Sequence, residues 1–188
     1  MIIRPARPED AEACRAIYAP IVADTVISFE TEPPDAAEMA ARIARILKTH
    51  PWLVAENDGA VIGYACASPH RDRAAYRWSV DVTAYVAEAA RGSGVGRALY
   101  QRLIRVLRRQ GYRAAFAGVT LPNPASVALH EAVGFKPVGV YPHVGYKHGR
   151  WRDTGWWGLV LDPGEAEPQE PIPFAAVADS PELEELLT

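Results

Sequence analysis

The sequence predicts a single α+β domain built on a mixed, mostly antiparallel sheet flanked by helices. Two helical patterns come early in the chain, a meander of strands follows, and a unit in which strands and helices alternate closes the fold. That order of elements is typical of a layered domain with a mixed sheet. The chain has 188 residues, 49% of them hydrophobic, and this is enough to bury one core.

Helix and strand signals alternate through the first half of the chain. A short strand precedes a helix with an acidic first turn and a regular apolar face, and Asp35 caps a second helix. Asn57, Asp58 and Gly59 form a strong hairpin signal between two strands. The expected elements are strands at 2–5, 52–56, 61–67 and 76–86, a helix beginning near Pro8, a loop at 24–34 and a helix after Asp35.

Boundary signals are stronger in the second half. Apolar residues at helical spacing predict a helix over 95–110, with Gly111 as its stop. Asn123 caps the next helix, Pro124 fills its first position, and Gly134 lies just past its end. Strands are expected at 113–119, 135–140 and 156–161, with an aromatic and basic loop at 141–157.

We expect one domain over residues 1–162 and a tail over residues 163–188. After Asp162 the composition shifts to Pro, Glu and Ala. Such a segment has few residues that can build a core. The tail is therefore expected to be disordered or to lie along a partner.

Composition excludes several classes of function. The net charge of −3 and the pI near 6.0 give no basic field for nucleic acid. The apolar runs are shorter than the roughly 20 residues of a membrane span, and the N-terminus lacks the apolar core of a signal peptide. Cys14 and Cys66 have no metal or redox spacing. We expect a cytoplasmic protein without a metal, a membrane partner or a nucleic-acid partner.

The stretch RGSGVGRALY at residues 91–100 predicts a phosphate site. Glycines at alternate positions, followed by a helix N-terminus, direct backbone N–H groups toward an anion. A P-loop would need Lys and Ser or Thr after Gly96, and the dinucleotide pattern would need glycine in place of Arg97. A third pattern, Arg/Gln-x-x-Gly-x-Gly/Ala, is complete at Arg91, Gly94 and Gly96.

This third pattern resembles the acetyl-coenzyme A loop of the GNAT N-acetyltransferase superfamily. Other segments are similar to its phosphinothricin and methionine sulfoximine/sulfone N-acetyltransferase branch. They are SFETEP (28–33), PWLVAE (51–56), the run with Arg71, Arg73, Tyr76 and Trp78, LPNPASVALHEAVGF (121–135) and GYKHGRWRDTGWW (145–157). Together they cover almost everything except the tail.

The resemblance implies the GNAT fold, acetyl-CoA as acetyl donor, a small amino acid-like amine as acceptor, and a homodimer. It also implies that Asn123, which the capping signal already explains, contacts coenzyme A. Backbone donors around Tyr85 and Val86 would stabilise the oxyanion that develops on the thioester carbonyl. The coenzyme-binding residues implied are Ala84, Tyr85, Val86, Arg91, Gly92, Ser93, Gly94, Val95, Gly96, Arg97 and Asn123.

Two residues are expected to carry the chemistry. The family places a Glu where this chain has Asp81, and a side chain shorter by one methylene favours proton transfer through a water. Without the resemblance, Asp81 would be a solvent-facing carboxylate or the partner of an arginine. His130 matches a residue near the sulfur and would protonate the leaving thiolate or orient a water. A lone histidine on a helix is otherwise more often a packing residue.

Substrate recognition is assigned to Arg71 and Arg73, because a guanidinium matches a carboxylate or phosphinate with two parallel hydrogen bonds. Tyr76 and Phe29 would line the pocket. The 141–157 loop is assigned to the rim of the active site or to a dimer interface. Two other functions stay open: a GNAT enzyme for another amine, and a non-catalytic module that binds acyl-CoA.

Overall fold

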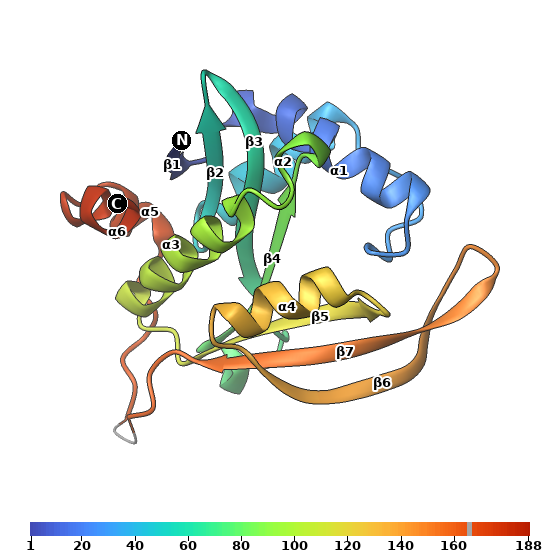
Figure 1. Ribbon diagram of the computed structural model, residues 1–188. Helices are drawn as coiled ribbons and strands as arrows, with labels where there is room; N and C mark the ends of the chain where they lie inside the picture. The colour runs from blue at the N-terminus through green and yellow to red at the C-terminus, as the bar shows by residue number, and fades with distance from the viewer. Residues whose placement is uncertain (165–166) are drawn as a thin grey trace.

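The computed structural model describes residues 1–164 and 167–188. A seven-stranded sheet in the order β1-β2-β3-β4-β5-β7-β6 runs through the molecule (Figure 1). The strands are β1 (Ile2–Pro5), β2 (Trp52–Asn57), β3 (Ala60–Pro69), β4 (Ser79–Val86), β5 (Ala114–Leu121), β6 (Lys136–Lys147) and β7 (Arg150–Val160). The helices are α1 (Ala11–Asp24), α2 (Ala36–Ile46), α3 (Val95–Gln110), α4 (Pro124–Ala132), α5 (Phe174–Ala178) and α6 (Glu182–Leu187), with 3-10 turns η1 (Pro8–Asp10), η2 (Ala74–Tyr76) and η3 (Glu88–Ala90).

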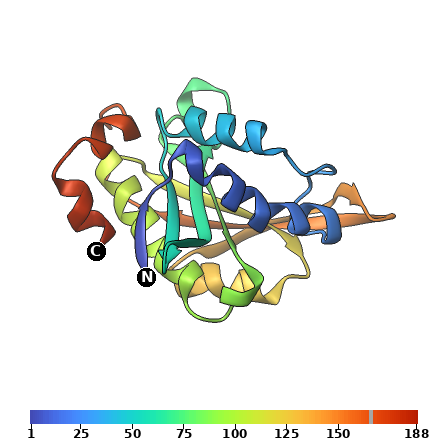
Figure 2. The same ribbon diagram turned by 90° about the horizontal axis from the view of Figure 1, so that it is seen from above.

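Helices cover both faces of the sheet, as the predicted layered architecture requires. Helices α1 and α2 pack on one face around Met39, Ile43 and Val54, and α3 packs on the other around Leu99 and Leu103. Figure 2 shows α1 and α2 on one side of the strands and α4 on the other. Every predicted helix boundary signal has its counterpart: Asp35 accepts from the Glu38 amide, and Asn123 accepts from the Ser126 amide.

The sheet opens between β4 and β5. These neighbours are parallel and pair only over Ser79–Asp81 against Ala114–Phe116, whereas all other neighbouring strands are antiparallel. Beyond Asp81 the two strands diverge (Figure 1). The backbone groups at the C-terminal end of β4 are therefore not used by a neighbouring strand on that side.

The structure corrects the predicted loop at 141–157. Most of it belongs to the long antiparallel pair β6 and β7, which turns at His148 and Gly149 and projects from the body of the molecule (Figure 1). Aromatic side chains pair across the strands, with Tyr146 opposite Trp151 and their ring centroids 5.4 Å apart.

A second correction concerns residues 76–86, where the strand begins only at Ser79. Residues 74–76 form the 3-10 turn η2 instead. No helix in the described residues combines the length and the apolar character that crossing a membrane requires.

The C-terminal tail also differs from the expectation, since residues 167–188 pack against this same chain. Phe174, Val177 and Leu183 are buried around Val106 of α3. The side-chain amide of Gln110 donates to the carbonyl oxygens of Thr49 and Ile172 at 2.9 and 2.7 Å. The few apolar residues of the tail are enough to cover the outer side of α3, because that helix supplies the matching surface.

Candidate active site

A cavity of about 550 Å³ lies where the sheet opens. Its walls are formed by the end of β4, the glycine loop, the first turn of α3, and one side of α4. The lining residues are Ile21, Ile27, Ala84, Tyr85, Val86, Ala90, Arg91, Gly92, Gly94, Val95, Gly96, Arg97, Asn123, Ala125, Ser126, Ala128 and Leu129.

The glycine loop is shaped to present backbone amides to this cavity. Gly92 and Gly94 have φ of 77° and 87°, a region that side chains with a Cβ rarely adopt. The first helical hydrogen bond of α3 runs from the Ala98 amide to the Gly94 carbonyl oxygen at 3.0 Å. The three preceding amides therefore lie outside the helical ladder, at the positive end of the helix dipole. This arrangement fits the diphosphate of coenzyme A.

Gly96 has a different role. Its φ is not positive, but a Cβ built there would lie 3.1 Å from the Leu129 side chain. The glycine lets α3 approach α4 closely, and this approach forms one wall of the cavity. Close packing of the two helices, rather than a turn, explains the last glycine of the motif.

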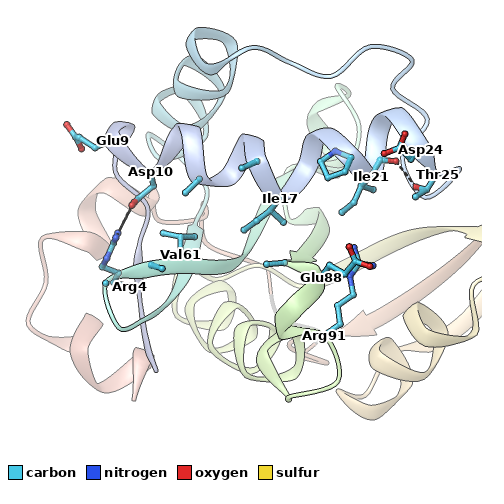
Figure 3. Close-up of a pocket in the computed structure, with 16 residues that line it drawn as sticks. Arg4, Glu9, Asp10, Ile17, Ile21, Asp24, Thr25, Val61, Glu88 and Arg91 are labelled. Carbon is cyan, nitrogen blue, oxygen red and sulfur yellow. Dashed lines mark hydrogen bonds and ion pairs between the residues drawn. The ribbon is translucent and has the colours of Figure 1, made fainter.

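A second and larger cavity, of about 820 Å³, shares Arg91 with the first and runs along α1 (Figure 3). Its lining includes four carboxyl groups, from Glu9, Asp10, Asp24 and Glu88. The Asp10 carboxylate is already paired with Arg4 at 2.7 Å. Because the surplus of carboxylates repels an anion, the smaller cavity is the better candidate for a phosphorylated ligand.

The inner end of the site is a pocket of about 50 Å³ that His130 and Tyr100 line together with the diverging strands. The backbone oxygen of Ser126 lies 2.7 Å from Nδ1 of His130, and the Tyr100 hydroxyl lies 2.9 Å from Nε2. A carbonyl oxygen can only accept, so Nδ1 carries the proton and Nε2 accepts from Tyr100. Burial lowers the pKa of His130.

Asp81 lies on β4 at the vertex of the sheet opening, where β4 still pairs with β5, and shares a face with Thr83 and Tyr85. Its carboxylate accepts a hydrogen bond from Nδ1 of His70 at 2.6 Å. Partial burial is the main influence on this carboxyl and raises its pKa above the ordinary value, while the bond from His70 opposes the shift. A partly buried carboxylate with a raised pKa is suited to accept a proton.

Of the predicted substrate residues, Arg71 and Tyr76 lie near this carboxylate and its partner His70. Arg71 lies over the Trp156 ring, 5.6 Å from its centroid, and Tyr76 stands edge-on to His70. Arg73 is exposed in the irregular segment before η2. Residues 70–73 are not part of a strand, so strand alternation does not relate the directions of the two arginines.

Phe29 lies in the loop between α1 and α2 and lines neither the coenzyme cavity nor the inner pocket. Its ring packs against Gly145 of β6, where a Cβ would come within 2.3 Å of it. Lys147 of β6 holds the same loop, because its buried Nζ donates to the carbonyl oxygens of Val22 and Ser28 at 2.7 and 2.8 Å. The β6–β7 arm therefore fixes the loop that carries Phe29.

Comparison with known proteins decides the family. Residues 3–156 match the family model described as an acetyltransferase (GNAT) domain. The chain belongs to the GNAT acetyltransferase family. It is an N-acetyltransferase that uses acetyl-CoA as its donor, which confirms the resemblance, the fold class and the donor predicted from the sequence.

Named relatives of this GNAT acetyltransferase act on related substrates. Phosphinothricin N-acetyltransferase of Alcaligenes faecalis is 45% identical over 165 residues, 87% of this chain and 84% of that protein. L-methionine sulfoximine/L-methionine sulfone acetyltransferase of Salmonella typhimurium is 37% identical, covering 86% of this chain and 95% of that protein. The crystal structure of a phosphinothricin acetyltransferase from Sinorhizobium meliloti in complex with acetyl-CoA superposes with a TM-score of 0.86 at 38% identity, covering 95% and 98% of the two chains.

The structure of this GNAT acetyltransferase brings together ten of the eleven predicted coenzyme-binding residues. Ser93 is the exception, because it lies outside the cavity lining and its hydroxyl donates to the Ala90 carbonyl oxygen at 2.6 Å. Sequence reasoning did not predict that Ile27 and one side of α4 line the cavity, and it did not single out His70. The helical periodicity of 124–132 could have indicated Ala125 and Leu129, but no local pattern indicates Ile27 or His70.

Proposed function

We propose that this enzyme transfers the acetyl group of acetyl-CoA to the primary amine of a small anionic amino acid analogue, of the phosphinothricin, methionine sulfoximine or methionine sulfone type. The observation that supports this most is spatial. The glycine loop follows the free end of β4, and the partly buried carboxylate of Asp81 lies on the same strand where the opening begins, with the charge of Arg71 acting on it. The names of the relatives support the same class of substrate.

The chemistry needs a proton acceptor, since an ammonium group has no lone pair for attack on a thioester. Asp81 provides the carboxylate on the substrate side. On the donor side, we propose that amides around Tyr85 and Val86, which line the cavity, stabilise the charge that develops on the thioester oxygen. Asn123 contributes from the cap of α4, where it lines both the main cavity and the inner pocket.

His130 belongs to the thioester end in this proposal. Its ring is neutral in the structure, with one nitrogen donating to Ser126 and the other accepting from Tyr100. A neutral histidine whose two ring nitrogens are both engaged in hydrogen bonds has no proton ready to donate to the thiolate. We therefore propose that His130 acts through the Tyr100 hydroxyl, and that His130→Ala lowers turnover more than it weakens acetyl-CoA binding.

A thiol-release screen tests the substrate class. Purified enzyme with acetyl-CoA is offered phosphinothricin, methionine sulfoximine, methionine sulfone, ordinary amino acids and spermidine. We expect the highest kcat/KM for the amino acid analogues, because the arginines attract anionic groups and repel a polyamine. Spermidine turnover above that of every analogue would overturn the assignment and leave acetyl transfer in place.

We also propose that the enzyme is a homodimer formed through β6. This strand is an edge of the sheet, and an apolar edge is a surface for association. The exposed large apolar residues on the arm are Val138, Val140, Tyr141, Val144, Tyr146 and Trp151. Analytical ultracentrifugation should show a dimer that Val140→Lys dissociates, whereas Ile2→Lys on the opposite edge strand leaves it intact.

A further inference from the structure

His70 is a histidine that no sequence motif singles out, yet it forms the closest polar contact of Asp81. It lies directly after β3, and Asp81 lies in the neighbouring strand β4. Nδ1 of His70 and a carboxylate oxygen of Asp81 are 2.6 Å apart. This is a short, charge-assisted hydrogen bond between two groups that both exchange protons in enzymes.

The imidazole ring is held firmly in place. Its face stacks on Phe116 of β5 with centroids 4.6 Å apart, and it meets Tyr76 and Trp156 edge-on. The side chain is only 14% exposed. Phe116 is also the register partner of Asp81 across the short parallel pairing. Histidine and carboxylate are thus fixed by the same strand pair that forms the vertex of the sheet opening.

The chemistry of the pair settles which nitrogen is available. An ionised carboxylate only accepts hydrogen bonds, so Nδ1 must carry the proton. In a neutral ring, Nε2 then has a free lone pair on the side of the ring that points away from Asp81. The Asp81 side chain is itself one methylene shorter than Glu, and one of its oxygens is engaged by His70. The imidazole therefore extends the reach of the carboxylate.

We propose that His70, oriented by Asp81, is the group that takes the proton of the substrate ammonium. The inference rests on the acetyl transfer proposed above. Nε2 accepts one proton from the ammonium, and the Asp81 carboxylate stabilises the imidazolium that forms. The amine nitrogen then bonds to the acetyl carbon, and the C–S bond breaks with its electron pair on sulfur. The thiolate takes the second proton of the nitrogen, which gives the free thiol and the neutral amide, and the imidazolium gives its proton to water.

The alternative is a structural ion pair that only anchors the segment after β3. Arg71 donates to the His70 carbonyl oxygen at 2.8 Å and its charge acts on Asp81, and Tyr76 meets the imidazole edge-on. An anchoring role would not depend on Nε2, since only Nδ1 contacts Asp81. Removing the nitrogens while keeping the ring therefore separates the two roles.

The decisive variant is His70→Phe, because phenylalanine keeps the stack on Phe116 and the edge contacts. We expect kcat to fall by about 10²-fold, a typical share for a general base, while the acetyl-CoA Kd stays unchanged in calorimetry. His50→Phe is the matched control, since His50 also stacks on an aromatic ring, that of Tyr112, and has no place in the site. It should keep the wild-type kcat.

A double variant and a spectrum sharpen the result. In His70→Phe/Asp81→Glu the longer carboxylate should reach the amine directly and recover much of the lost kcat. Nitrogen-15 spectra of histidine-labelled enzyme should show His70 as the Nδ1–H tautomer, and Asp81→Ala should abolish that preference. This second measurement needs neither substrate nor turnover.

Each outcome has a separate meaning. If wild-type enzyme releases no thiol with any amine, the proposed function is wrong and the step falls with it. If wild-type enzyme is active and His70→Phe retains its kcat, acetyl transfer stands and His70 is not the base. A His70 spectrum with Nε2 protonated in the active enzyme would also overturn the inference.

Discussion

The two ends of the sheet opening are built in different ways. The glycine loop is local: residues 91–97 follow one another in the chain and carry their phosphate-binding geometry in the turn and the first turn of α3. The proton-accepting end is assembled from four elements, with Asp81 from β4, His70 from the end of β3, Tyr76 from η2 and Phe116 from β5. A local motif tolerates change elsewhere in the chain, whereas the assembled cluster depends on strand register.

Substitutions at the two ends should therefore change different kinetic parameters. Changes in the loop should act on acetyl-CoA binding, and changes in the cluster should act on turnover or on the amine. If the two ends acted as one functional unit, a substitution at either end would change both acetyl-CoA binding and turnover. The following variants test that separation.

The largest effect is expected at Asp81. Asp81→Ala removes both the carboxylate and the orientation of His70, so kcat should fall by about 10²–10⁴-fold. The acetyl-CoA Kd, measured by calorimetry, should not change, because Asp81 does not line the coenzyme cavity. Unchanged turnover would show that Asp81 neither takes the proton nor orients the group that does.

The next effect is expected in the loop. Gly94→Val places a β-branched residue at a φ of 87°, and the strain must move the loop amides. We expect the acetyl-CoA Kd to rise by about 10-fold or more, with kcat at saturating donor reduced much less. Gly139→Ala is the control, since a Cβ there meets nothing within 4 Å and its φ is not positive. An equal loss in kcat would contradict the separation of the two ends.

Arg73→Ala should give a smaller effect, confined to the amine. A charge-assisted hydrogen bond to the substrate carboxylate contributes about 1.5–3 kcal/mol, so KM for an anionic analogue should rise about 10- to 100-fold. KM for acetyl-CoA should stay constant. If KM for the amine is also constant, Arg73 is a surface residue and recognition lies with Arg71.

The mildest test is the pH profile. The pKa of Asp81 is raised mainly by burial, and its carboxylate must be ionised to orient His70, so kcat/KM should fall as the pH drops through a value above the ordinary carboxyl range. The same shift makes stability highest below the unfolded pKa and lowers it as the pH rises through the folded value. Asp81→Asn should remove this dependence of the unfolding free energy. A wild-type acid limb at the ordinary carboxyl value would contradict the raised pKa.

The sequence by itself determined the features whose causes are local. Asn123, Pro124 and Gly134 bound α4, and Gly94 at a positive φ marks the start of α3, because caps and turns depend on neighbouring residues alone. The family motifs added the donor and the class of reaction. The extension of β6 and β7 through residues 141–157 was missed because cross-strand pairs, not consecutive residues, stabilise it.

Only the tertiary structure decided what depends on distant segments. It placed His70 against Asp81, gave Gly96 its role in packing α3 on α4, and folded the C-terminal segment back onto Val106. These contacts join residues separated by many positions in the chain, so no spacing rule can indicate them. Sheet register and helix packing bring the groups together, and the chemistry at the vertex of the opening follows from that arrangement.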